Sequence, residues 1–227
     1  MKLCMFSPRD ADLERGWPGR IDGDRVVQLA AQTLQSFFTG GGRAREHAEY
    51  ALDDVVLRAP VLHPPSVRLF AGSAFQFGNP ASIYGPGEAI SWPEGGDQLD
   101  CEVRLAAVVG AEGAIGGFTA MIDWTARDLP PAKDKDFATS IGPVVVTPEG
   151  LEWPVRVSAR VNGEERIARQ LDPPWDELVS RAARNTELVA GDLLGADGFP
   201  AAPPWLQPGD TVEVEADGLG VLRSAVR

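Results

Sequence analysis

The stretch DCEVRL at residues 100–105 decides how the fold of this chain is interpreted, because charged and apolar residues alternate along it. In an extended strand, successive side chains point to opposite faces. Asp100, Glu102 and Arg104 therefore share one face, and the apolar residues between them share the other. This alternation predicts a β-strand that is buried on one side and whose charged side needs partners.

A second group of charges lies in the sequence IDWTARD at residues 122–128. It offers the carboxylate of Asp123 and the guanidinium of Arg127 to the charged face of the first stretch. Two interpretations are open for each group. Glu102 and Asp123 either form a site or merely face solvent, and Arg127 either belongs to that site or is a structural partner of Asp128.

The composition limits the classes of function. The chain has 227 residues, 44% of them hydrophobic, enough for one large domain or for one domain with a small N-terminal module. The net charge of -12 disfavours phosphate backbones and anionic lipids, so we expect no nucleic-acid partner and no membrane partner. The apolar start at residues 1–7 is too short for a signal peptide, so we expect a cytoplasmic protein.

The cysteines, Cys4 and Cys101, lie in apolar stretches that have the character of strands. Buried free thiols are therefore favoured over a disulfide, which is the alternative. No zinc motif can be built from these two residues.

Glycine and proline are scattered along the chain as turn signals, which is typical of a strand-rich domain. Asp22-Gly23 and Asn162-Gly163 predict hairpin turns. Helices are predicted at residues 30–38, 44–52 and 175–186. Strands are predicted at residues 2–6, 19–22, 25–29, 68–72, 101–110, 117–122, 144–147, 155–161, 164–170, 211–215 and 220–226.

A proline-rich stretch at residues 57–66 predicts a linker, because proline removes amide donors and favours extended backbone. We therefore expect a small N-terminal α/β module at residues 1–62 and a larger domain at residues 63–227. Helices are a minor part of both, so the predicted class is α+β, mainly β.

Four stretches occur in an order that resembles the fumarylacetoacetate hydrolase (FAH) family. They are the acidic strand at residues 100–110, the run at 117–128 that ends in IDWTARD, the lysine-containing loop KDFATSIGP at 135–143, and the tail at 206–223. The resemblance extends from about residue 69 to the C-terminus. It implies an FAH-like mixed β-sandwich roll as the catalytic domain, usually in a homodimer.

The resemblance also implies an enzyme that uses a divalent cation such as Mg²⁺ or Mn²⁺ on small oxo-acids or their enols. In such reactions a cation held by carboxylates stabilises an enolate. Glu102 and Asp123 stand where the family has metal ligands, and Lys135 and Arg127 stand where it holds the substrate and stabilises oxyanions.

Two further residues are candidates for substrate contact. Phe75 lies in an aromatic stretch that predicts an apolar pocket wall, although ordinary core packing explains it equally well. Asp197 lies in a loop that replaces the family's Thr-Gly-Thr sequence.

The chain departs from the family's pattern at Arg104, where a second metal-binding glutamate is usual. A guanidinium keeps its charge at ordinary pH and competes with a cation for the same carboxylates, so we expect weak metal binding or none. A water-activating histidine is missing as well. His47 and His63 fall outside the matching loop, so general-base activation of water would be left to Asp or Glu.

The sequence thus predicts an FAH-family enzyme for a small oxo-acid or enolisable carbonyl compound, with an altered metal site. Its reaction would be C–C bond hydrolysis, decarboxylation or keto-enol isomerisation. One alternative is a metal-free isomerase, cyclase or lyase in which Arg104 acts in place of the cation. Another is a catalytically silent homologue.

Overall fold

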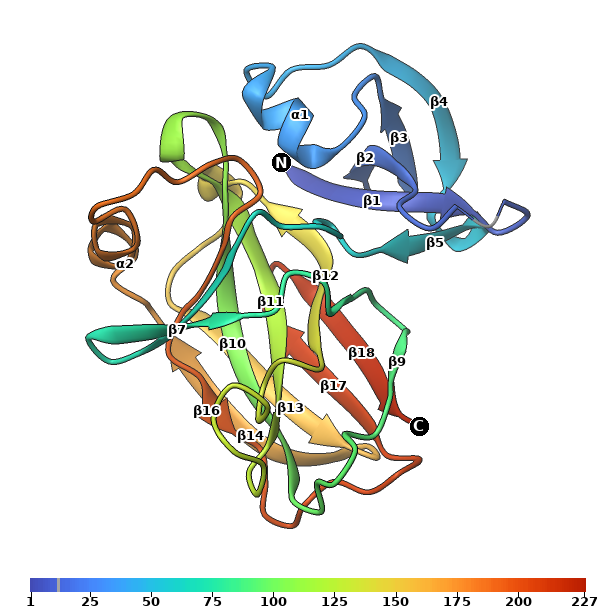
Figure 1. The fold of residues 1–227 in the computed structure, drawn as a ribbon. Helices are drawn as coiled ribbons and strands as arrows, with labels where there is room; N and C mark the ends of the chain where they lie inside the picture. The colour runs from blue at the N-terminus through green and yellow to red at the C-terminus, as the bar shows by residue number, and fades with distance from the viewer. Residues whose placement is uncertain (12) are drawn as a thin grey trace.

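The computed structural model describes residues 1–11 and 13–227, most of which lie in two β-sheets. The N-terminal strands and α1 gather at one end of the molecule, and α2 lies on its outside (Figure 1). None of the helices in the described residues is long and apolar enough to cross a membrane. Because most of the described residues that form regular structure lie in strands, the fold is mainly β and matches the predicted class.

The larger sheet has 13 strands, and its main path runs in the order β4-β3-β2-β1-β12-β11-β10-β15-β6-β7. Outside this path, β5 pairs with β1, β8 with β12, and β16 with β10. Its strands are β1 (Lys2–Pro8), β2 (Trp17–Asp22), β3 (Arg25–Leu29), β4 (Glu46–Ala51), β5 (Val55–Arg58), β6 (Val67–Ala71), β7 (Ala74–Gly78), β8 (Ile83–Tyr84), β10 (Leu99–Val109), β11 (Ile115–Ala126), β12 (Thr139–Val146), β15 (Leu193–Gly195) and β16 (Phe199–Pro200).

The second sheet has five strands in the order β14-β13-β17-β18-β9. They are β9 (Ala89–Ile90), β13 (Val155–Val161), β14 (Glu164–Leu171), β17 (Thr211–Ala216) and β18 (Gly220–Val226). The helices are α1 (Leu34–Thr39) and α2 (Trp175–Ala182), with short 3₁₀ turns η1 (Leu52–Asp54), η2 (Ala111–Gly113) and η3 (Pro148–Gly150).

Strand β10 separates two hydrophobic clusters. Its Cys101, Val103 and Leu105 are fully buried in the larger cluster, which also contains the apolar residues of the second sheet. Ala106 and Val108 point the other way, into the smaller cluster beneath α1. Each fully buried large aliphatic side chain contributes about 1.5–3 kcal/mol, so the register of β10 is strongly fixed. That register determines which charges reach the opposite face.

Both predicted hairpins are present, and both cysteines are buried and free. Asn162 and Gly163 adopt φ angles of 52° and 82°, the left-handed conformation that a two-residue hairpin turn requires. Burial raises the pKa of Cys4 to about 12, which makes its thiol unreactive.

The prediction of a helix at residues 44–52 is wrong, because this segment forms strand β4 and pairs with β3. Its side chains are largely exposed, so it has no apolar face that a helix could bury. The predicted helix at residues 30–38 is shorter and shifted. It begins after Thr33, whose side chain accepts a hydrogen bond from the Ser36 amide in a capping box.

The N-terminal module is more sheet-like than expected and continuous with the main sheet. Strand β1 pairs with β12, with Lys2 opposite Val146 and Leu3 opposite Val145. The boundary between residues 62 and 63 stays a prediction.

Candidate functional site

The site begins with a cross-strand pair of carboxylates. Strands β10 and β11 are antiparallel, and their register places Glu102 directly opposite Asp123. Directly opposite residues project to the same face of a sheet, so the two carboxylates lie together. Asp123 is fully buried, whereas the side chain of Glu102 is 13% exposed. The alternation of the first strand therefore does bring the charges to one face, as the sequence predicts.

Arg104 contacts both carboxylates and is only 3% exposed. Its Nε donates to Asp123 Oδ2 over 3.0 Å, and its Nη2 donates to Glu102 Oε2 over 2.5 Å. Its Nη1 donates to the carbonyls of Phe70 and Ala196, each over 2.7 Å. The guanidinium thus joins β10 to β6, β11 and the loop after β15.

The loop after β15 approaches Arg104 so closely that it needs a glycine. A Cβ at Gly198 would lie 2.7 Å from the Arg104 Cζ, a distance that real side chains do not adopt. Gly198 therefore allows the backbone to cover the guanidinium.

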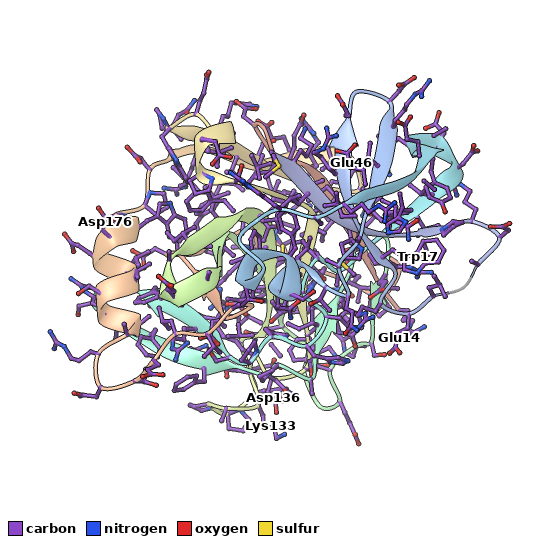
Figure 2. The ribbon with its side chains drawn as sticks, turned by 90° about the horizontal axis from the view of Figure 1, so that it is seen from above. Glu14, Trp17, Glu46, Lys133, Asp136 and Asp176 are labelled. Carbon is purple, nitrogen blue, oxygen red and sulfur yellow. The ribbon has the colours of Figure 1, made fainter. Side chains whose placement is uncertain are left out.

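Lys135 closes the cluster from the loop between β11 and β12. Its Nζ lies 3.0 Å from Glu102 Oε2, 2.8 Å from Asp123 Oδ2 and 2.6 Å from Thr125 Oγ1. The side chain is 11% exposed. On the same loop, Lys133 and Asp136 pair with each other over 2.8 Å at the surface (Figure 2). Lys135, unlike its neighbour Lys133, is thus directed into the site.

Arg127 occupies the more open side of the cluster, where its side chain is 31% exposed. Its Nη2 lies 2.7 Å from Asp100 Oδ2 and 2.8 Å from Glu102 Oε1. The expected alternative partner, Asp128, instead accepts hydrogen bonds from the backbone amides of Asp97 and Gln98. Arg127 therefore belongs to the cluster.

The charges of the cluster are balanced, because Arg104, Arg127 and Lys135 face the carboxylates of Asp100, Glu102 and Asp123. Burial alone would raise the pKa of Glu102, but the positive charges of Lys135, Arg104 and Arg127 outweigh it and lower this pKa to about 2. Burial raises the pKa of Asp123, and Arg104 and Lys135 oppose that rise.

The effect of Glu102 on stability can be tested. Its pKa is lowered from 4.5 to about 2 in the folded chain, so its ion pairs stabilise the fold above pH 4.5. We expect that contribution, on the order of 2 kcal/mol after solvent screening, to disappear as the pH falls from 4.5 to 2. Urea unfolding of the wild type and of Glu102→Gln across this range measures the difference.

The exposed pair of Glu177 and Arg181 supplies the control, because Glu177→Gln should change stability little at any pH. A gap between wild type and Glu102→Gln that stayed constant from pH 6 to pH 2 would contradict the assignment.

The described side chains do not match the oxygen shell that Mg²⁺ or Mn²⁺ requires. Such cations take about six oxygen ligands, whereas Glu102 Oε2 and Asp123 Oδ2 already accept from Arg104 and Lys135. Asp123 Oδ1 is buried and has no hydrogen-bond partner, but one oxygen is not a cation site. Among the described residues, no group of three or more His, Cys, Asp or Glu could hold a metal ion.

The two remaining candidates for substrate contact lie next to residues that contact Arg104, but they are not part of the network of ion pairs. Phe75 is half-buried on β7 and packs against Phe70 and Phe77, with the Arg68 guanidinium 5.9 Å from its ring. Asp197 is exposed, accepts a hydrogen bond from the Gly72 amide, and lines a pocket of about 260 Å³ beside α2. Among the described residues, neither forms a hydrogen bond or an ion pair with Glu102 or Asp123.

The two histidines lie at the surface, outside the site, as the sequence predicts. His47 and His63 are both exposed, and neither takes part in the charge cluster.

Some members of the site were not predicted. Thr125 follows Asp123 by two residues, so strand alternation was a usable signal that it shares the face of the cluster. The carbonyls of Phe70 and Ala196 carry no such signal, because any residue supplies a carbonyl.

Fold and site together define a two-sheet β protein with a buried cluster of carboxylates and cations. Residues 40–227 match the family model "Fumarylacetoacetate (FAA) hydrolase C-terminal". This match covers most of the chain, so the chain belongs to the fumarylacetoacetate hydrolase family.

Curated relatives include oxaloacetate tautomerases. The chain is 29% identical to the mitochondrial oxaloacetate tautomerase Fahd2a of Rattus norvegicus over 175 residues, 64% of this chain and 56% of that protein. It is 25% identical to oxaloacetate tautomerase fahd2 of Xenopus laevis over an alignment that covers 100% of this chain and 90% of that protein. With the rat protein, the match thus spans little more than half of the relative's length.

Solved structures share the fold over the full chain. The 5-carboxymethyl-2-hydroxymuconate delta-isomerase of Mycobacterium smegmatis has a TM-score of 0.80 at 25% identity, covering 100% of this chain and 99% of that chain. A 2-keto-3-deoxy-D-arabinonate dehydratase complexed with magnesium and 2,5-dioxopentanoate has a TM-score of 0.82 at 19% identity, with the same coverage. At 19% identity the second likeness shows the fold alone.

Proposed function

We propose that this chain is an FAH-family enzyme that promotes enolisation of a small oxo-acid without a divalent cation. Keto-enol tautomerisation is the reaction we favour, because relatives that are oxaloacetate tautomerases match the chain. Hydrolysis is less favoured, because the cluster contains no histidine to activate water.

One observation carries the proposal. The family resemblance implies that Glu102 and Asp123 are metal ligands, but their Oε2 and Oδ2 atoms are both bonded to Arg104 and Lys135. Two fixed positive charges thus stand where a divalent cation would neutralise these carboxylates. A guanidinium and an ammonium can stabilise developing negative charge on a substrate oxygen when they are held in place in advance.

The cations of the cluster and one carboxylate would have different roles. Enolisation moves a proton from the carbon next to the carbonyl to the carbonyl oxygen, and Asp123, whose pKa burial raises, would accept this proton from the carbon and return it to the oxygen. Arg104 is buried and bonded to protein on three sides, so we assign it a positioning role for Glu102 and Asp123. Arg127 is the most exposed of the three cations and would bind the carboxylate of the substrate. Lys135 contacts Glu102 and Asp123 and would face the enolate oxygen after exchanging one of these acceptors.

The test is a tautomerase assay in which the ultraviolet absorbance of the enol form of oxaloacetate is monitored over time. Pyruvate and longer oxo-acids are tested as further substrates in the same assay. We expect turnover that is unchanged by EDTA and reduced about 100-fold in Lys135→Ala. Lys133→Ala is the matched control, because Lys133 lies on the same loop but pairs with Asp136 at the surface. Turnover that appears only with added Mg²⁺ or Mn²⁺ would refute the proposal that the reaction needs no divalent cation.

A catalytically silent homologue is the second candidate. It is favoured by the balance of charges, since every cation of the cluster already has a carboxylate partner. Absence of turnover across the whole panel, with and without divalent cations, would support it.

The homodimer and the cytoplasmic location stay predictions. Light scattering coupled to size-exclusion chromatography at several concentrations measures the first, and fractionation of the source cells measures the second.

A further inference from the structure

The three cations of the cluster differ in how many N–H groups they leave free. An ammonium has three donors, and those of Lys135 meet Glu102, Asp123 and Thr125. Arg104 is almost fully buried, and its Nε, Nη1 and Nη2 all donate hydrogen bonds to protein oxygens. Neither group presents a free donor at the surface.

Arg127 is different. Its Nε and Nη2 are bonded to Asp100 and Glu102, but no described acceptor meets its Nη1. The side chain is 31% exposed while its Nε and Nη2 face carboxylates, which leaves the Nη1 edge of the guanidinium as the side that is open to solvent and to a ligand. Among the described cations of the cluster, Arg127 thus offers the accessible N–H groups.

Asp100 sets the direction of that edge. Its Oδ2 accepts from Arg127 Nε over 3.0 Å and from Nη2 over 2.7 Å. Its Oδ1 accepts from the backbone amides of Cys101 over 2.7 Å and Ala202 over 3.0 Å. Asp100 is 1% exposed, so a rigid carboxylate holds one side of the guanidinium and leaves the other side outward.

We propose that Asp100 is a positioning residue that directs the Nη1 edge of Arg127 toward the carboxylate group of an oxo-acid substrate. The inference rests on the proposed function and adds a residue to it. Nitrogen donors approach both oxygens of Asp100, so the site requires an acceptor-only side chain. Asparagine would turn an NH₂ group toward donors and release Arg127 from its orientation.

The experiment measures binding and turnover separately. Sodium pyruvate and sodium oxalate serve as probes in calorimetric titrations of the full chain, and oxaloacetate serves as the substrate. For Asp100→Asn and for Arg127→Ala we expect the Kd for the probes and the KM for oxaloacetate to rise about tenfold or more. We expect kcat to fall less than KM rises, because the groups that face the enolate oxygen remain.

A double-mutant cycle separates positioning from a general loss of structure. If Asp100 acts through Arg127, the variant with both changes should bind the probes no more weakly than Arg127→Ala alone, within about twofold. Unfolding midpoints above the assay temperature verify that each variant is folded. The pair of Arg160 and Glu215, 2.9 Å apart on the second sheet, is the matched control, and Arg160→Ala should leave Kd and KM unchanged.

Three outcomes would overturn the inference: unchanged probe binding in folded Asp100→Asn, additive losses in the double variant, or no binding of either probe by the wild type. If Asp100→Asn does not fold, Arg127→Lys decides the question, since lysine keeps the charge but cannot keep the two-sided contact. Unchanged binding in Arg127→Lys would then refute it. Probe binding without turnover would refute the proposed function and leave the role of Asp100 standing.

Discussion

Replacing Arg104 by glutamate should convert this chain into a protein that needs a divalent cation to be stable. The change removes the guanidinium from Glu102 and Asp123 and adds a fourth carboxylate to the cluster. Without metal these carboxylates repel one another, so we expect the unfolding temperature of Arg104→Glu to fall well below that of the wild type. With Mg²⁺ or Mn²⁺ it should recover.

The size of the recovery follows from linkage. A cation at a concentration 100 times its Kd stabilises the folded state by about 2.7 kcal/mol. Thermal unfolding in EDTA and in millimolar MgCl₂ or MnCl₂ measures the shift, and calorimetric titration measures the number of cations bound. We expect binding to Arg104→Glu that is lost when Asp123→Ala is added, and no shift for the wild type.

Arg160→Glu is the control for this experiment, because it reverses a charge on a half-buried arginine of the second sheet, outside the cluster. The unfolding temperature of Arg160→Glu should not change when Mg²⁺ or Mn²⁺ is added. A wild-type chain that bound Mg²⁺ or Mn²⁺ as tightly as Arg104→Glu would show that Arg104 does not exclude the cation.

The part of the site that depends on strand alternation was predictable from the sequence. Alternation places Asp100, Glu102 and Arg104 on one face, and the antiparallel register then brings Asp123 opposite Glu102. It cannot reveal that Arg104 is covered, because the covering groups are the carbonyls of Phe70 and Ala196. Those residues are distant in sequence, and their identity has no bearing on the contact.

The fold was predictable where a buried face leaves an apolar pattern. Strands β10, β13 and β17 carry that pattern and lie where the sequence predicts them, apart from shifts at their ends. The wrong prediction of a helix at β4 arose where such a pattern is missing, because the exposed residues of this strand show no apolar periodicity. Its pairing with β3 determines its conformation, and that is a tertiary contact which local composition does not encode.

Replacing Arg104 by methionine should cost about 3–5 kcal/mol of folding stability, because it removes one of the two cations that pair with both buried carboxylates. Asp123 is fully buried, and the carbonyls of Phe70 and Ala196 would also lose their donor. Urea unfolding at pH 7 measures the loss, with the slope of the transition showing whether the denatured state has changed. Arg160→Met, which breaks a pair that is partly open to solvent, should cost less than about 1 kcal/mol.

The pH dependence of the stability of Arg104→Met shows whether the variant is destabilised by the loss of a charge or by the loss of side-chain volume. Methionine fills part of the space of arginine, so a packing defect would be the same at every pH. A lost charge raises the folded-state pKa of Glu102 and Asp123, since Arg104 lowers both. Lowering the pH from 7 to 5 should then add protons to the folded variant and narrow its stability gap to the wild type. A gap that stays constant over this range would mean that Arg104 stabilises the fold by packing, and the cluster would lose its electrostatic explanation.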